Sequence, residues 1–264
     1  MSAPDLPTFP ASQQKSVAAI LRAAGCVFAE DEARLLLHTA RSRDELDAMV
    51  DRRVAGEPLE PVLGWAEFCG LRIHIDSGVF VPRRRTEFLA WQACSLVTPG
   101  SVVVDMCCGS GAVGAVLQST LDAVDLYAVD VEPAAVRCAR RNITPPERVL
   151  EGDLFEPLPT KLLGRVDVVV ANAPYVPTES IRLMPPEARL HEPLVSLDGG
   201  TDGLELQRRI IADAAPWLRP GGCLLVETST EQVEMTVETF TRGGFLTRVA
   251  TYSETASTVV IGQR

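Results

Sequence analysis

The chain has 264 residues, 46% of them hydrophobic, with a formal net charge of −10 and a sequence pI of about 4.9. That length fits one large domain, or a small domain joined to one of standard size. The acidic balance argues against direct nucleic-acid binding, which needs many Lys and Arg side chains along the phosphate backbone. No apolar run reaches the roughly 18 residues of a membrane span, so we expect no membrane partner.

The N-terminal segment MSAPDLPTFPASQQ has no basic region followed by an apolar one, so we expect a short flexible lead and no signal peptide. The chain contains seven cysteines and no Cys-x-x-Cys pair. This pattern is typical of neither a disulfide framework nor a zinc site, and we expect no metal. Together these features indicate a cytoplasmic protein with reduced thiols.

Residues 1–62 have a helical pattern. The stretch QQKSVAAILRAAG places Val17, Ile20 and Leu21 on one helix face and stops at Gly25. Two further segments, AEDEARLLLHTA and RDELDAMVDRRVAG, have similar spacing and complete a small helical bundle. The bundle contains no cluster of catalytic side chains, so we expect it to select a substrate or partner.

Residues 63–86 predict a β-hairpin linker between two domains. In EFCGLRIHIDSGVFVP, polar and apolar residues alternate, and Gly70 and Asp-Ser-Gly are turn signals. This alternation differs from the helical spacing before it and from the strand–helix order that follows.

Residues 87–264 alternate strand and helix patterns. The predicted strands are SVVVD, DLYAVD, RVLEGD, VDVVVAN and CLLVE, with helical stretches between most of them. This order predicts an α/β fold with a parallel sheet and helices on both faces. The last two strands, GFLTRVATYS and STVVIGQ, are separated by a short break, so we expect an antiparallel terminal hairpin at the sheet edge.

A glycine loop in VVVDMCCGSGAVGAVL follows the first strand of this region. Gly109 and Gly111 allow close backbone approach to a cofactor. With Gly114 they also satisfy G-x-G-x-x-G, the dinucleotide pattern, but Asp105 precedes them and would repel two phosphates. A carboxylate there suits the sulfonium and ammonium end of S-adenosylmethionine. Cys107 lies in the loop as a small apolar residue, and we include it in the cofactor site.

The next two strands also end in acids. Asp130, followed by Val131, is placed to accept both ribose hydroxyls, although an NAD site would use the same position. Asp153 is placed to accept from an adenine amino group, with Leu154 or Phe155 packing on the ring. Each acid alone could cap a helix. Together with the glycine loop, the acids predict one cofactor slot.

The fourth strand ends in the tetrapeptide Asn-Ala-Pro-Tyr, which predicts the catalytic site. A planar nitrogen is a poor nucleophile, and acceptors on its two N–H groups favour methyl transfer to it. The Asn172 side chain, which also borders the cofactor, accepts one N–H, and the Ala173 carbonyl accepts the other. Pro174 fixes the chain shape, and Tyr175 offers a flat face for stacking. No strong base is required.

Four sequence blocks together resemble the HemK/PrmC family of protein glutamine methyltransferases. They are GEPLEPVLGWAEFCGLRIHIDSGVFVPRRRTE, DMCCGSGA, NAPY and EARLHEPLVSLDGGTDGL, and the match runs from about Ala29 to Arg264. The resemblance implies a seven-stranded, Rossmann-like class I methyltransferase sheet that uses S-adenosylmethionine. It also implies N5-methylation of the glutamine in the Gly-Gly-Gln motif of a peptide-chain release factor, so a protein substrate is the expected partner.

The resemblance carries family roles onto named residues of this chain. The glycine loop falls on Asp105, Gly109 and Gly111, the ribose acid on Asp130, and the substrate motif on residues 172–175. We also expect HEPLVSLDGGTDGL to form a loop over the substrate, with residues 192–194 fixing its path.

Two segments depart from the family pattern, at three positions. The family motif is Asn-Pro-Pro-Tyr, and here Ala173 takes the second place. The family hairpin exit reads Pro-Arg-Pro-Glu-Thr-Glu, and here residues 82–87 read Pro-Arg-Arg-Arg-Thr-Glu. We interpret Arg84 and Arg85 as solvated turn residues and Arg83 as structural or cleft-forming. The departures leave the chemistry in place and bear on the identity of the substrate.

Four alternatives stay open at this point. The first keeps N-methyl transfer but takes a small molecule or free amino acid as acceptor. The second is an adenine methyltransferase, which uses a similar tetrapeptide, although the acidic charge opposes it. The third is an NAD-dependent oxidoreductase, and the fourth is a non-catalytic binding module on the same fold.

Overall fold

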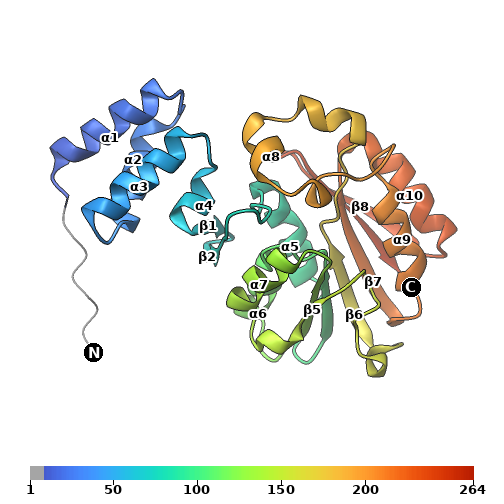
Figure 1. The fold of residues 1–264 in the computed structure, drawn as a ribbon. Helices are drawn as coiled ribbons and strands as arrows, with labels where there is room; N and C mark the ends of the chain where they lie inside the picture. The colour runs from blue at the N-terminus through green and yellow to red at the C-terminus, as the bar shows by residue number, and fades with distance from the viewer. Residues whose placement is uncertain (1–8) are drawn as a thin grey trace.

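A computed structural model of the chain describes residues 9–264, and the first part of the predicted N-terminal lead lies outside the described residues. The helical region contains α1 (Ala11–Ala23), α2 (Ala29–Thr39), α3 (Arg43–Val54) and the short α4 (Leu59–Leu63). They form a bundle at one end of the molecule, drawn in blue in Figure 1. Its buried core includes Leu21, Leu36 and Leu46.

One detail of the bundle differs from the sequence prediction. Val17 and Leu21 are buried as expected, but Ile20 is 49% exposed and Ala18 is buried instead. The predicted face was therefore wrong at Ile20. Helix α1 packs against α2 and α3, which cover a narrow stripe of its surface. Helical spacing alone does not decide whether the residues beside that stripe, such as Ile20 and Ala18, are buried.

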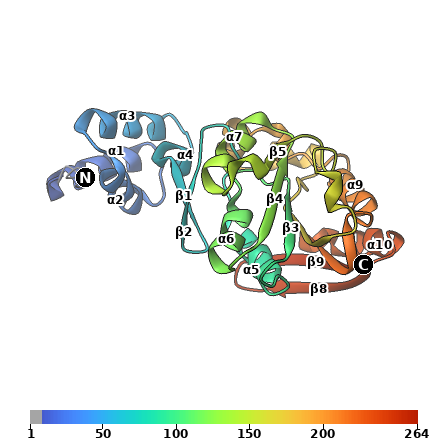
Figure 2. The ribbon, with the colours of Figure 1, turned by 90° about the horizontal axis from the view of Figure 1, so that it is seen from below.

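The predicted hairpin is present and joins the two larger parts of the molecule. Strands β1 (Trp65–Phe68) and β2 (Leu71–His74) pair antiparallel, and both turn residues, Cys69 and Gly70, have positive φ. Phe68 and Ile73 pack into the core of the α/β region, whereas Trp65 packs against the helical bundle. Figure 2 shows the hairpin between the bundle and the sheet region.

The large sheet has seven strands in the order β5-β4-β3-β6-β7-β9-β8. The first five strands of this sheet along the chain, β3 to β7, are parallel, while β9 lies antiparallel between β7 and β8. The predicted parallel sheet and terminal hairpin are thus confirmed. The strands are β3 (Val102–Met106), β4 (Asp125–Asp130), β5 (Val149–Glu151), β6 (Val166–Ala171), β7 (Leu218–Thr228), β8 (Leu246–Tyr252) and β9 (Ser257–Gln263).

Helices cover both faces of this sheet, and so its central strands are apolar on both sides. Along β3, for example, Val103 belongs to the core beneath α5, α6 and α7, and Val104 to the core beneath α9 and α10. The helices are α5 (Glu87–Cys94), α6 (Ala112–Thr120), α7 (Pro133–Asn142), α9 (Glu205–Ala214) and α10 (Val233–Arg242), with the short α8 (Pro186–His191) outside the two layers.

All seven cysteines are free thiols. Among residues 9–264, no helix has the length and apolar character needed to cross a membrane. The boundaries predicted at residues 62 and 86 remain predictions, although the bundle, the hairpin and the sheet occupy the corresponding segments.

Candidate active site

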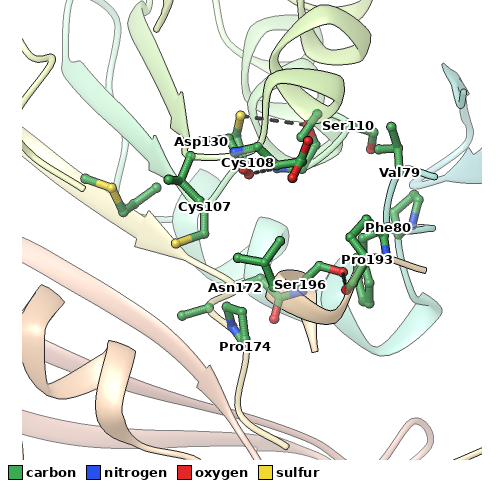
Figure 3. A pocket seen from close by; sticks show the side chains of 18 of the residues that line it. Val79, Phe80, Cys107, Cys108, Ser110, Asp130, Asn172, Pro174, Pro193 and Ser196 are labelled. Atoms are coloured by element: carbon green, nitrogen blue, oxygen red, sulfur yellow. Dashed lines mark hydrogen bonds between the residues drawn. The ribbon is translucent and has the colours of Figure 1, made fainter. Parts of the chain in front are cut away.

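A cavity of about 1290 Å³, its open mouth included, lies at the C-terminal ends of β3, β4 and β6. This is the edge where ligands bind in open parallel sheets. In Figure 3, Cys108, Ser110 and Asp130 lie on one side of the cavity, opposite Asn172 and Pro174. The lining also includes the hairpin exit and a loop before α9. The main lining segments are residues 78–80, 105–110, 129–132, 152–154, 172–176, 193 and 195–197.

The glycine loop turns sharply between β3 and α6. Cys107, Gly109 and Gly111 have φ of 56°, 55° and 77°. A left-handed conformation is unusual for a cysteine and indicates local strain that the surroundings maintain. At Gly111 a Cβ would also come within 2.8 Å of Ile143 Cδ1. Glycine is therefore needed there for backbone conformation and for contact with the end of α7.

The two loop cysteines do not have the character of nucleophiles. Cys108 is buried, and burial raises the pKa of both the Cys107 and Cys108 thiols well above the usual value. The neighbouring carboxylates, above all Asp105 and Asp130, raise the two pKa values further. Since a reactive thiol needs a lowered pKa, these side chains serve as small apolar filling.

Asp105 lies at the floor of the cavity and is only 3% exposed. Its Oδ2 accepts a hydrogen bond from the Gly114 N–H at 2.9 Å. Burial raises the pKa of Asp105 to about 8; the Gly114 N–H opposes the rise, and the charge of Asp130 adds to it. A Cβ at position 114 would lie 3.1 Å from this carboxylate and 3.0 Å from Leu126. Packing in α6 thus explains the third glycine without a dinucleotide.

Asp130 holds the glycine loop in place through hydrogen bonds to the backbone. One carboxylate oxygen accepts the Gly109 N–H at 2.8 Å, and the other accepts the Glu132 N–H at 2.9 Å. Burial raises the pKa of Asp130, and these two N–H groups oppose the rise. The next residue, Val131, is half exposed and borders the cavity. The carboxylate therefore lies at the predicted place with both oxygens already oriented by backbone donors.

The third acid, Asp153, also borders the cavity and forms an ion pair with Arg209 of α9 at 2.6 Å. Leu154 follows it with φ of 48°, and its buried side chain contributes to the wall. Phe155 instead stacks on Trp217 in the core, with ring centroids 5.8 Å apart. Of the two residues predicted to pack on an adenine ring, only Leu154 faces the cavity.

Asn172 and the three residues after it form the opposite wall. Asn172 follows the last residue of β6, and its Nδ2 donates to Thr86 Oγ1 at 3.3 Å. No hydrogen bond to its Oδ1 occurs among the described residues. Ala173 is buried, and Pro174 cannot donate a backbone hydrogen bond. Asn172 Oδ1 thus has no donor among the described residues, and the acceptor roles of this oxygen and of the Ala173 carbonyl stay predictions.

Tyr175 is held from two sides. Its hydroxyl donates to Glu227 Oε1 at 3.2 Å, and the Arg85 guanidinium lies 5.3 Å from its ring centroid. Burial, followed by the charge of Glu227, raises the pKa of the Tyr175 hydroxyl well above its usual value. Arg85 Nε also lies 3.3 Å from Glu227 Oε1. The prediction that Arg85 is an ordinary solvated turn residue was therefore wrong.

Sequence reasoning missed Thr86 and Glu227. Thr86 ends a single 3-10 turn, Arg84–Thr86, and is 2% exposed. Glu227 lies near the end of β7, also 2% exposed, and does not itself line the cavity. The sequence feature that could have identified Glu227 is its position as an acid at the end of the apolar run CLLVE. This run belongs to β7, which pairs with β6, the strand before Asn172.

The first part of the loop beside the cavity is anchored by two ion pairs. Glu192, 7% exposed, accepts two hydrogen bonds from Arg83 at 2.6 Å, which agrees with a structural or cleft-forming Arg83. Glu187 in α8 forms an ion pair with Arg53 of α3 at 2.7 Å. Residues 193 and 195–197 then line the cavity. The helical bundle and the catalytic region are thus connected through this loop.

The residues of the cavity fit S-adenosylmethionine. Carboxylates from three strand ends, Asp105, Asp130 and Asp153, suit a cofactor with cationic and hydroxyl groups, and apolar walls such as Leu154 suit an aromatic ring. Gly109, whose added Cβ would meet nothing within 4 Å, keeps the loop open toward the cavity. Fold and site together define a Rossmann-like methyltransferase.

Comparison with known proteins agrees with this class. Residues 71–184 match the family model described as methyltransferase small domain. A methyltransferase structure from Pyrococcus furiosus superposes with a TM-score of 0.55 at 17% identity, covering 74% of this chain and 89% of that one, which supports the fold.

Two relatives are similar to this chain in sequence, and the first of them shows its family. The release factor glutamine methyltransferase of Geobacter sulfurreducens is 38% identical over 75% of this chain and 69% of its own. A 4-amino-L-phenylalanine/4-methylamino-L-phenylalanine methyltransferase of Streptomyces pristinaespiralis is 36% identical over 70% of this chain and 65% of its own. The chain belongs to the family of release factor glutamine methyltransferases, and the resemblance to the HemK/PrmC family is confirmed.

Proposed function

We propose that this protein methylates the side-chain amide nitrogen of a glutamine in a peptide-chain release factor, with S-adenosylmethionine as methyl donor. The observation that carries the proposal is one cavity with three strand-end carboxylates on one side and the Asn172–Tyr175 wall on the other. The relatives named for this activity, such as that of Geobacter sulfurreducens, support it. The reaction would take place in the cytoplasm, and the free thiols fit a reducing compartment.

The proposed roles follow from the position of each residue. The cofactor side is formed by Asp105, Cys107, Gly109, Asp130, Val131, Asp153 and Leu154, with Asn172 at its border. Gly111 does not line the cavity and contributes through the turn of the loop, where its φ is 77°. When bound, S-adenosylmethionine would supply an electrophilic methyl group on sulfur.

On the acceptor side, Asn172 Oδ1 and the Ala173 carbonyl accept the two N–H groups of the planar nitrogen, and Tyr175 packs beside the amide. Acceptors placed this way stabilise the positive charge that develops on the nitrogen, and the proton leaves to water afterwards.

The test is transfer of labelled methyl from S-adenosylmethionine to purified release factors that contain Gly-Gly-Gln. A Gln→Ala release factor is the matched control. Label on the wild-type release factor alone is the expected result. Absence of label, with cofactor binding demonstrated by calorimetry, would contradict the proposed substrate but not the methyl donor.

A second candidate acceptor is a small molecule or a free amino acid. The relative named for 4-amino-L-phenylalanine methylation supports it, because an aromatic amine is also a planar nitrogen with two N–H groups. Arg85, which stands where the family pattern has an acid, is half exposed at the rim of the cavity and provides a positive charge there. Free 4-amino-L-phenylalanine in the same labelling assay separates the two candidates.

A further inference from the structure

Glu227 is a buried acid that the proposed reaction does not use directly. It lies near the end of β7, behind the acceptor wall, and its side chain is 2% exposed. Burial raises its pKa, and the Thr86 hydroxyl, Arg85 and Tyr175 oppose the rise, in that order. A buried carboxylate is unfavourable unless its oxygens are satisfied. Its neighbours therefore indicate what it does.

All three of these neighbours belong to the acceptor side of the cavity. The Tyr175 hydroxyl and Arg85 Nε both approach Oε1, at 3.2 and 3.3 Å. Oε2 is buried without a hydrogen-bond partner among the described residues. Thr86 lies close to it, because its chain neighbour Arg85 pairs with Glu227 and its hydrogen-bond partner Asn172 follows the strand beside β7. The structure shows no hydrogen bond between Thr86 and Oε2, and rotation of the Thr86 hydroxyl toward this oxygen would satisfy it.

The direction of the Asn172 amide depends on Thr86. An asparagine side chain has nearly the same shape with its oxygen and nitrogen exchanged, so hydrogen-bond partners decide which end faces the cavity. Asn172 Nδ2 donates to Thr86 Oγ1 at 3.3 Å. A threonine hydroxyl could equally donate to an amide oxygen. It is confined to accepting from Asn172 only when its own proton is directed elsewhere.

We propose that Glu227 is a positioning residue that draws the Thr86 proton, and so fixes Asn172 with its Oδ1 toward the methyl acceptor, while its Oε1 holds Tyr175. An ionised carboxylate can only accept hydrogen bonds. Thr86 must therefore donate to Glu227 and accept from Asn172, and the reverse order is excluded. The inference deepens the function proposed above and rests on Asn172 binding the nitrogen that receives the methyl group.

Glu227→Gln tests the polarity with little change of shape. The new amide can donate to the Thr86 hydroxyl oxygen, which frees the Thr86 proton to turn toward Asn172 and favours the reversed amide. We expect kcat for methyl transfer to a Gly-Gly-Gln release factor to fall at least about tenfold, since losing one preorganised acceptor entirely costs about 10²–10³ in rate. The KM for S-adenosylmethionine should stay within about twofold, because Glu227 lies outside the cofactor side.

Thr86 variants separate positioning from a merely structural effect. Thr86→Val should lower kcat to a similar extent, and Thr86→Ser, which restores the hydroxyl, should recover most of the rate. Because Glu227 acts through Thr86, adding Glu227→Gln to Thr86→Val should cause little further loss. A Glu227→Gln enzyme with wild-type kcat would overturn the inference, as would losses that multiply in the double variant.

A second readout needs no methyl acceptor. The side-chain ¹⁵N–¹H resonances of Asn172, identified by their absence in Asn172→Asp, should shift in Glu227→Gln and Thr86→Val, with a smaller change in Thr86→Ser. Unchanged Asn172 resonances in the first two variants would refute the inference even if the wild type methylated no release factor. Conversely, an inactive wild type with the expected shifts would contradict only the proposed substrate.

Discussion

Replacing Asp105 by Asn should change how the stability of the ligand-free protein depends on pH. The carboxyl is buried, and its pKa is raised from 3.8 to about 8 in the folded protein. Between these two values the folded chain holds a proton that the unfolded chain has released. The free energy of unfolding therefore falls as pH rises through this window, by about 1.3 kcal/mol per pH unit between pH 5 and pH 7 from this group alone.

Asp105→Asn removes this contribution and keeps a group of similar shape beside the Gly114 N–H. Urea unfolding followed by tryptophan fluorescence and circular dichroism at pH 5, 6 and 7 gives the free energies of both proteins. Glu227, whose pKa is also raised, affects both proteins alike, so the difference between the two slopes reports Asp105 together with its coupling to Asp130. Parallel slopes for wild type and variant would refute a strongly raised pKa at this position.

Three further predictions concern the cavity and its support. Asn172→Ala should lower kcat by about 10²–10³ with the Kd for S-adenosylmethionine largely kept, measured by calorimetry beside the methyl-transfer assay. Asp130→Ala should instead raise that Kd, roughly 10- to 100-fold, because the Gly109 N–H also loses a charged acceptor. Arg53→Met should lower the unfolding free energy by about 3–5 kcal/mol, since Glu32 is left buried without its partner. Adding Glu32→Leu should recover part of it, and additive losses would contradict the pairing.

The fold was predictable because its signals are local. Strands β3, β4 and β6 are apolar runs of the length expected for a sheet buried on both faces, and each has an Asp or Asn at its last residue or next to it, at the functional edge. Because all parallel strands point the same way, their C-terminal residues had to meet. The side chains predicted there do border one cavity, although their individual roles stay predictions.

The remaining features depend on neighbours that are distant in the sequence. Tyr175 and Glu227 are 52 residues apart and meet only because β7 lies beside β6. Arg85, which follows the hairpin, forms an ion pair with that same acid, Glu227. Phe155 was one of two residues considered for packing on the adenine ring, but it stacks in the core on Trp217, from the segment before β7. Sequence spacing identifies strand ends, but it does not tell which side chain a neighbouring strand or loop will engage.

The two sides of the cavity differ in how closely they follow the family pattern. The cofactor side has the expected acid, glycines and ribose acid in a continuous, braced loop. Of the three departing residues, Ala173 and Arg85 line the acceptor side, whereas Arg84 does not line the cavity. At position 85 a positive charge replaces the family's acid and lies against Glu227 and the Tyr175 ring. An acid there would instead place a second carboxylate near Glu227. The substitution therefore alters the charge on the Asn172–Tyr175 side of the cavity and leaves the residues of the glycine-loop side as the family pattern has them.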